Sequence, residues 1–128
     1  MGRLWLPLAI LTGSLTGATQ HTVHEIRLTG RFVPTVIEAR AGDSLRFVLT
    51  SGGPHNVEFV KDSIPAPMRT LLESAMPGEK IGPLSSPLLI SAGETYAFKI
   101  PNLEPGRYAF VCLPHVSSNM RGALVIVR

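Results

Sequence analysis

Cysteine, charged residues and long apolar runs are all scarce in this sequence of 128 residues. The single cysteine, Cys112, excludes an internal disulfide framework, a zinc knuckle built on two cysteines, and haem attachment through paired thiols. Charged residues make up only 16% of the chain and form no basic cluster, so the net charge of +3 does not indicate nucleic-acid binding. Because there is only one cysteine, any metal site must combine ligands of different types. No apolar run reaches the roughly 20 residues that a membrane-spanning helix needs.

Apolar residues, glycine and proline are plentiful. An apolar content of 45% is enough for a packed core, and the length fits one small domain. The 12 glycines and 11 prolines are spread without a repeat, which is typical of short strands joined by many turns. Leu45, Phe47 and Leu49, for example, alternate with more polar residues at the period of a strand. Seven segments have this strand-like character: residues 23–29, 31–39, 44–50, 55–60, 94–100, 107–112 and 123–127. The sequence thus predicts an all-β sandwich or barrel.

One segment has a helical pattern. Between residues 67 and 76, the apolar residues Met68, Leu71, Leu72 and Ala75 recur at helical spacing, and Pro67 suits a first helical turn. We expect a short surface helix there, followed over residues 78–91 by an irregular crossover between the two sheets. Met68 and Met76 are interpreted as its packing face rather than as metal ligands.

Residues 1–18 have the layout of a secretory signal. Arg3 precedes an apolar run from Leu4 to Leu15, and small residues lead to a cleavage site after Ala18. We therefore expect export, to the periplasm or another compartment outside the cytosol, and a mature domain of residues 19–128. An uncleaved amphipathic anchor is the alternative.

Four side chains suit a metal. Cys112, His115 and Met120 lie within nine residues, CLPHVSSNM, between the end of one predicted strand and the start of the last. His55, which begins a predicted strand after a Gly-Gly-Pro turn, is the candidate for the fourth ligand. Two imidazoles, one thiolate and a weak thioether are the donors of an electron-transfer copper site, whereas structural zinc prefers a set of strong ligands. With no open coordination position for a substrate, the set indicates electron transfer rather than an enzyme.

The same residues carry a family resemblance. Residues 37–127 resemble the cupredoxins, the type 1 (blue) copper proteins of the plastocyanin/azurin family, and are most similar to plastocyanin. The matching stretches are AGDSLRFVLTSGGPHNVEFVKDSIP, LLISAGETYAFKIP and GRYAFVCLPHVSSNMRGALVIV. The resemblance implies an eight-stranded Greek-key β-sandwich with His55, Cys112, His115 and Met120 as the ligands of one copper ion. It also implies that Asn56 hydrogen-bonds to the loop that carries Cys112.

The sequence departs from plant and algal plastocyanins in three places. Val111 stands where the family usually has a tyrosine, which argues against a second, remote route for electrons. Leu113 replaces a serine or threonine, so Asn56 must find a backbone partner. Acidic patches are missing, since residues 65–76 hold one acid and one base. These differences favour a bacterial cupredoxin of respiratory or general redox use over a photosynthetic one.

The sequence therefore predicts a monomeric, soluble one-electron carrier. The resemblance implies that electrons leave through His115, with an apolar docking surface formed by Leu113, Pro114, Val116, Gly53 and Pro54. The expected partner is an acidic redox protein, such as a cytochrome or a copper-dependent reductase or oxidase. A copper-delivery protein is the alternative function, whereas the absence of His-x-His pairs excludes a fragment of a multicopper oxidase.

A second copper site is a further alternative at the mature N-terminus. If cleavage follows Ala18, Thr19-Gln20-His21 could bind Cu(II) through a free amine, two amides and an imidazole. The other interpretation is a frayed polar terminus.

Overall fold

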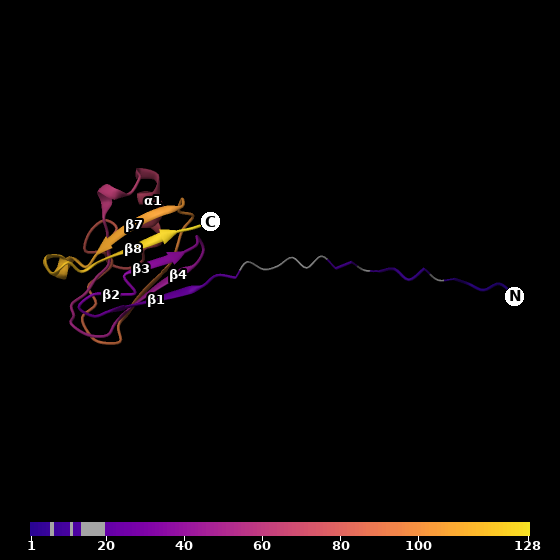
Figure 1. Cartoon of the computed structure of the whole chain (residues 1–128), viewed down its shortest axis with the longest axis horizontal. Coiled ribbons are helices and arrows are strands. Elements are labelled where there is room, and N and C mark those ends of the chain that lie inside the picture. Colours follow the sequence, from indigo (N-terminus) through magenta and orange to yellow (C-terminus); the bar gives the residue numbers. More distant parts are fainter. Residues whose placement is uncertain (6, 11, 14–19) are drawn as a thin grey trace.

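Two four-stranded sheets pack face to face in the computed structural model, which describes residues 1–5, 7–10, 12–13 and 20–128 (Figure 1). The strands of the first sheet lie in the order β2 (Phe32–Val33), β1 (Val23–Leu28), β4 (Ser44–Leu49) and β6 (Thr95–Lys99). Those of the second sheet lie in the order β3 (Val36–Ala39), β8 (Arg121–Ile126), β7 (Gly106–Val111) and β5 (Glu58–Phe59). β1 pairs with β4 and β3 with β8 in parallel, and the other pairs are antiparallel. The predicted β-sandwich is confirmed.

Two of the predicted strands differ from the observed ones. The segment 31–39 is not one strand: β2 ends at Val33 and β3 begins at Val36 in the other sheet. Pro34 lies at the break, and its missing N–H explains why the ladder does not continue through it. The segment 55–60 contributes only β5, and His55 is joined to Leu89 by an isolated bridge. The described residues therefore form eight short strands where seven segments were predicted.

The predicted helix is α1 (Ala66–Ala75), with Pro67 in its first turn. Met68 and Leu72 are buried in the core, whereas Leu71, expected on the same face, is exposed. Met76, which follows the helix, is also buried, so the packing role predicted for Met68 and Met76 is confirmed. The crossover over residues 78–91 forms no strand and bridges the segment 55–58 at two points. The part of the chain that the structure describes also contains two short 3-10 helices, η1 (Lys61–Ser63) and η2 (Leu113–Ser118).

Phenylalanine rings join the two sheets. Phe110 of β7 meets Phe32, Phe47 and Phe59 edge-on, at centroid distances of 4.8, 5.9 and 5.6 Å. Phe32 and Phe47 belong to the first sheet, whereas Phe59 and Phe110 belong to the second. Such edge-to-face contacts add to the free energy of burial. Side chains alternate between the two faces along a strand. Cys112, two positions after Phe110, therefore points to the same side of the sheet as Phe110, and it is buried.

None of the helices among the described residues is both long enough and apolar enough to cross a membrane. The cleavage site predicted after Ala18, and Thr19 of the proposed N-terminal copper site, lie outside the described residues.

Candidate metal centre

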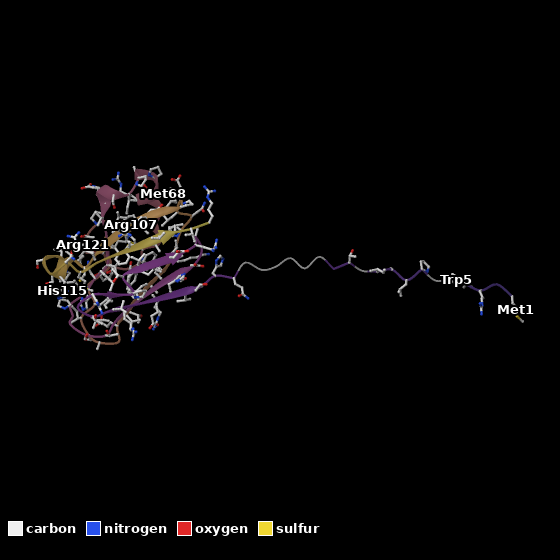
Figure 2. All side chains as sticks on the ribbon, viewed as in Figure 1. Met1, Trp5, Met68, Arg107, His115 and Arg121 are labelled. Carbon is white, nitrogen blue, oxygen red and sulfur yellow. The ribbon has the colours of Figure 1, made fainter. Side chains whose placement is uncertain are left out.

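Three of the four predicted ligands meet at one end of the sandwich. The Cys112 sulfur lies 3.6 Å from Nδ1 of His55 and 3.4 Å from Nδ1 of His115. All three ligand atoms lie within 4.8 Å of one another, and they form the one such group in the part of the chain that the structure describes. His115 lies at the end of the molecule opposite to the N-terminal segment (Figure 2).

Backbone hydrogen bonds close the loop that carries Cys112, His115 and Met120. The N–H of His115 donates to the carbonyl of Cys112 at 3.1 Å, and the N–H of Met120 donates to the carbonyl of His115 at 3.2 Å. The N–H of Cys112 in turn donates to the carbonyl of Met120 at 3.0 Å. Asn119 adopts the left-handed conformation, with φ of 61°, which turns the chain back into β8. Met120 is buried, and its backbone pairs with that of Cys112.

His55 is oriented by a hydrogen bond on its far side. Its Nε2 lies 2.7 Å from the carbonyl oxygen of Ser51, which can only accept, so Nε2 carries the proton. Nδ1 is left with its lone pair facing the Cys112 sulfur, and this is the arrangement that fixes a metal-ligating imidazole. Burial lowers the pKa of His55, and the neighbouring His115 lowers it further, although the Ser51 bond acts in the opposite direction. The neutral ring that a metal requires is therefore favoured.

The thiol of Cys112 is fully buried. Burial raises the pKa of Cys112, while hydrogen bonds from the backbone N–H groups of Asn56 and His115 to the sulfur partly offset this. Without a cation the thiol keeps its proton, whereas a metal ion stabilises the thiolate directly. The site thus suits a metal that binds sulfur strongly.

The donor set and its spacing fit copper. A thiolate and an imidazole on one metal, at about 2.3 and 2.0–2.1 Å from it, lie roughly 3.5–3.8 Å apart. Of the observed separations between sulfur and nitrogen, 3.6 Å lies within this range and 3.4 Å lies just below it. Two imidazoles and one thiolate, with a thioether nearby, are the donors of blue-copper sites.

Asn56 connects the two ligand-bearing segments. Its Oδ1 accepts the backbone N–H of Leu113 at 2.7 Å, so the predicted bond to the backbone of the Cys112 loop is confirmed. Its Nδ2 donates to the hydroxyl of Ser85 at 3.0 Å, and both side chains are fully buried. Sequence reasoning missed Ser85 because the surrounding segment, rich in Gly, Pro and Ser, carries no motif.

Exposed apolar side chains lie next to His115 in the chain. His115 is half-buried, whereas Leu113 and Val116 are 45% and 41% exposed. Ile90 is 60% exposed and adjoins this surface, because its carbonyl oxygen packs against Gly53. Ile90 was not predicted, since its position depends on how the crossover folds.

The remaining histidines lie apart from the metal centre. Nε2 of His24 is 2.9 Å from Oδ2 of Asp43, and Nδ1 of His21 is 3.9 Å from Oδ1 of the same carboxylate. His21 precedes β1, and His24 is the second residue of that strand.

Comparisons with known proteins agree with the geometry of the site. The family described as "Copper binding proteins, plastocyanin/azurin family" matches residues 20–127. Plastocyanin of Vicia faba is 37% identical over 95 residues, which are 74% of this chain and 86% of that protein. The chloroplastic minor isoform of plastocyanin from Arabidopsis thaliana is also 37% identical over 95 residues, but there the match spans only half of the relative's length.

Solved structures of a plastocyanin and an auracyanin are also similar to this chain. Oxidised plastocyanin from Dryopteris crassirhizoma is 25% identical, with a TM-score of 0.64 over 81% of this chain and all of that one. Reduced auracyanin from Roseiflexus castenholzii, 20% identical, has a TM-score of 0.56 over 87% of this chain and all of that one, which shows the shared fold. Copper is therefore the cofactor that this site is built to hold. The chain belongs to the plastocyanin/azurin family of copper-binding proteins, whose plastocyanin-like members are electron carriers and not enzymes.

Proposed function

We propose that this protein is an exported, soluble one-electron carrier with a single type 1 copper ion held by His55, Cys112, His115 and Met120. Bound copper supplies the one-electron chemistry, by alternating between Cu(II) and Cu(I). The observation that carries the proposal is the uneven exposure of the four side chains. His55, Cys112 and Met120 are at most 1% exposed, whereas His115 is half-buried within an apolar surface. A redox partner can thus approach the metal centre at the partly exposed side chain of His115.

The buried residues hold the site in one geometry. Hydrogen bonds to the carbonyl of Ser51 and to Oδ1 of Asn56, together with the closed loop between Cys112 and Met120, leave little freedom for the ligands to move. Burial excludes water, so the surroundings need not reorganise each time the charge changes. This rigidity supports rapid electron transfer.

The apolar surface suits brief contacts. We call it the docking patch and define it by its uncharged residues: Gly53, Pro54, Ile90, Leu113, Pro114 and Val116. Redox encounters bury little surface, below about 1,200 Å², and a patch of this kind allows a partner to leave after transfer. Without Arg3 of the predicted signal, the net charge of the domain is 11 − 9 = +2, which favours an acidic partner, with an attraction that salt weakens.

Burial of the ligands supports a carrier rather than a copper-delivery protein. Delivery requires exposed sulfur ligands that another protein can reach, and both sulfur atoms here belong to buried residues. Mixing the Cu(I) protein with a strong Cu(I) chelator distinguishes the two functions. We expect release over hours, whereas complete transfer within the mixing time would support delivery.

The first test is the visible spectrum of the protein, with and without residues 1–18, after addition of Cu(II). We expect intense blue absorption from the thiolate–copper bond, and its loss in a Cys112→Ser variant. Weak or absent colour in the parent protein would contradict the proposed ligand set.

The docking patch is tested by Val116→Asp, with Val23→Asp as control. Both valines are exposed, but Val23 begins β1 at the other end of the sandwich. We expect Val116→Asp to slow electron self-exchange between two copies about tenfold or more, because two like charges then face each other. Reduction of a soluble c-type cytochrome should slow as well. Equal electron-transfer rates in both variants and the parent protein would contradict the proposed role of the docking patch.

Export is tested by sequencing the N-terminus of the protein recovered from the producing cell and locating it by fractionation. The proposal expects a start at Thr19 and recovery outside the cytosol. Recovery with Met1 retained and attached to membranes would instead support the uncleaved anchor.

A further inference from the structure

Ser85 is a fully buried serine in the crossover, far from the ligands in sequence. Its hydroxyl oxygen accepts a hydrogen bond from Nδ2 of Asn56 at 3.0 Å and donates one to the carbonyl of Ser86 at 3.3 Å. It lies where the crossover runs beside the segment that carries His55, since Ser85 and Glu58 form an isolated bridge.

The orientation of the Asn56 amide follows from its two partners. The backbone N–H of Leu113 can only donate, so the amide must present Oδ1 to it and turn its NH₂ group towards Ser85. The hydroxyl of Ser85 accepts from that NH₂ group, while its own proton is directed to Ser86. Removing the Ser85 hydroxyl would leave the buried NH₂ group of Asn56 without this partner and so weaken the hold on the amide.

The orientation of Asn56 matters because this residue touches the metal centre through its backbone. Asn56 directly follows His55, and its N–H hydrogen-bonds to the sulfur of Cys112. Leu113, which the Asn56 side chain holds, directly follows Cys112. One amide group thus holds the two segments at a fixed distance, and Ser85 anchors that amide from a third segment.

We propose that Ser85 is a positioning residue of the copper centre, which holds Asn56 so that its N–H stays on the thiolate and keeps the reduction potential high. An N–H dipole on the sulfur withdraws electron density, and Cu(II) depends on that density more than Cu(I) does. Loosening the N–H therefore favours the oxidised state. This inference rests on the ligand set of the proposed function but not on any redox partner.

The experiment compares Ser85→Ala with Ser86→Ala, in the copper-loaded protein. Both serines are fully buried neighbours, but the Ser86 hydroxyl bonds only backbone groups, the N–H of Val57 and the carbonyl of Pro87. We expect Ser85→Ala to lower the midpoint potential, to shift the thiolate–copper absorption band and to release copper to a chelator several-fold faster. Ser86→Ala should lower thermal stability and leave the potential and the band unchanged.

Conservative variants separate positioning from a structural role. Ser85→Thr keeps the hydroxyl and should restore the potential of the parent protein. Ser85→Cys offers a much weaker hydrogen-bonding group and should give an intermediate potential, which also tests the proposal if Ser85→Ala does not fold. Parent-like potentials in both Ser85→Ala and Ser85→Cys, or an equal shift in Ser86→Ala, would overturn it. A parent protein without blue colour would instead refute the ligand set.

Discussion

The tautomer of His55 and the proton of Cys112 are set by their immediate neighbours. The carbonyl of Ser51 keeps the proton of His55 on Nε2, and burial keeps the proton on the Cys112 thiol until a cation replaces it. Residues that never touch the metal therefore prepare the side chains that do.

We expect Met120 to affect the reduction potential of the copper centre more than its affinity for copper. A buried thioether is a weak axial donor, so its replacement changes the balance between Cu(I) and Cu(II) more than the affinity. We predict that Met120→Gln lowers the reduction potential, because an amide oxygen favours Cu(II), and that Met120→Leu raises it. Voltammetry measures both.

Met76→Leu is the matched control, since Met76 is as buried as Met120 but packs beside α1. Its potential should equal that of the parent protein. If all three variants share one potential, Met120 is not an axial ligand.

The ligand residues were predictable because their signal is local. Cys112, His115 and Met120 belong to one short loop, and His55 follows a turn that brings it to a strand end. Ser85 was not predictable, because its partner Asn56 is 29 positions away and the contact depends on how the crossover folds. Spacing in the sequence identifies the candidate ligands, whereas the residues that hold those ligands in place are found only in the folded structure.

At the scale of secondary-structure elements, α1 shows what the helical spacing of apolar residues can and cannot predict. The apolar residues at helical spacing correctly predicted the helix, but Leu71 and Leu72 differ by only about 100° around its axis. Both fall within one broad apolar stripe. Which of the two enters the core depends on how the helix packs, and the structure buries Leu72.

We predict opposite outcomes for these neighbours. Leu72 is completely buried, so Leu72→Ala should lower the free energy of unfolding by about 2–5 kcal/mol. Leu71 is exposed, so Leu71→Ala should change it by roughly 0.5 kcal/mol or less. Urea unfolding of the copper-free protein measures both, and similar losses would place both side chains in the core.

Strand boundaries were harder to predict than strand existence. The segment 31–39 reads as one strand, yet Pro34 separates two short strands that belong to different sheets. The alternation of apolar residues shows which side chains face inward, but not which sheet a strand joins, because the inner faces of both sheets form the same core.

For the molecule as a whole, Asp43 stabilises the end of the sandwich remote from the metal. Its Oδ1 accepts the N–H of Thr22 at 3.0 Å, and its Oδ2 accepts the N–H of Arg40 at 3.0 Å and bonds Nε2 of His24 at 2.9 Å. Burial alone would raise the pKa of Asp43, but these hydrogen bonds outweigh it and lower the pKa to about 2.

This carboxylate makes stability depend on acid pH. Because the folded pKa lies below the ordinary value of 3.8, the contribution of Asp43 is complete above about pH 4 and is lost as pH falls towards 2. At pH 7, Asp43→Asn should cost about 2 kcal/mol, typical of losing hydrogen bonds to a buried charge. Thermal unfolding at several pH values measures the difference.

The gap between Asp43→Asn and the parent protein should narrow between pH 4 and pH 2. Glu25→Gln is the control, since Glu25 lies exposed on β1, where it pairs with Arg46. A gap of constant size down to pH 2 would mean that Asp43 acts through packing rather than through its charge.

His55 and Cys112 are 57 positions apart, and the chain has no second cysteine with which to join such distant segments. A copper ion bound to both acts as a cross-link that closes this long loop. In the chain-entropy account, a disulfide closing a loop of that size stabilises the folded state by roughly 4 kcal/mol. The proposed copper ion would then also be a cross-link of the fold, and losing it would loosen the β-sandwich as reducing a disulfide loosens a small secreted domain.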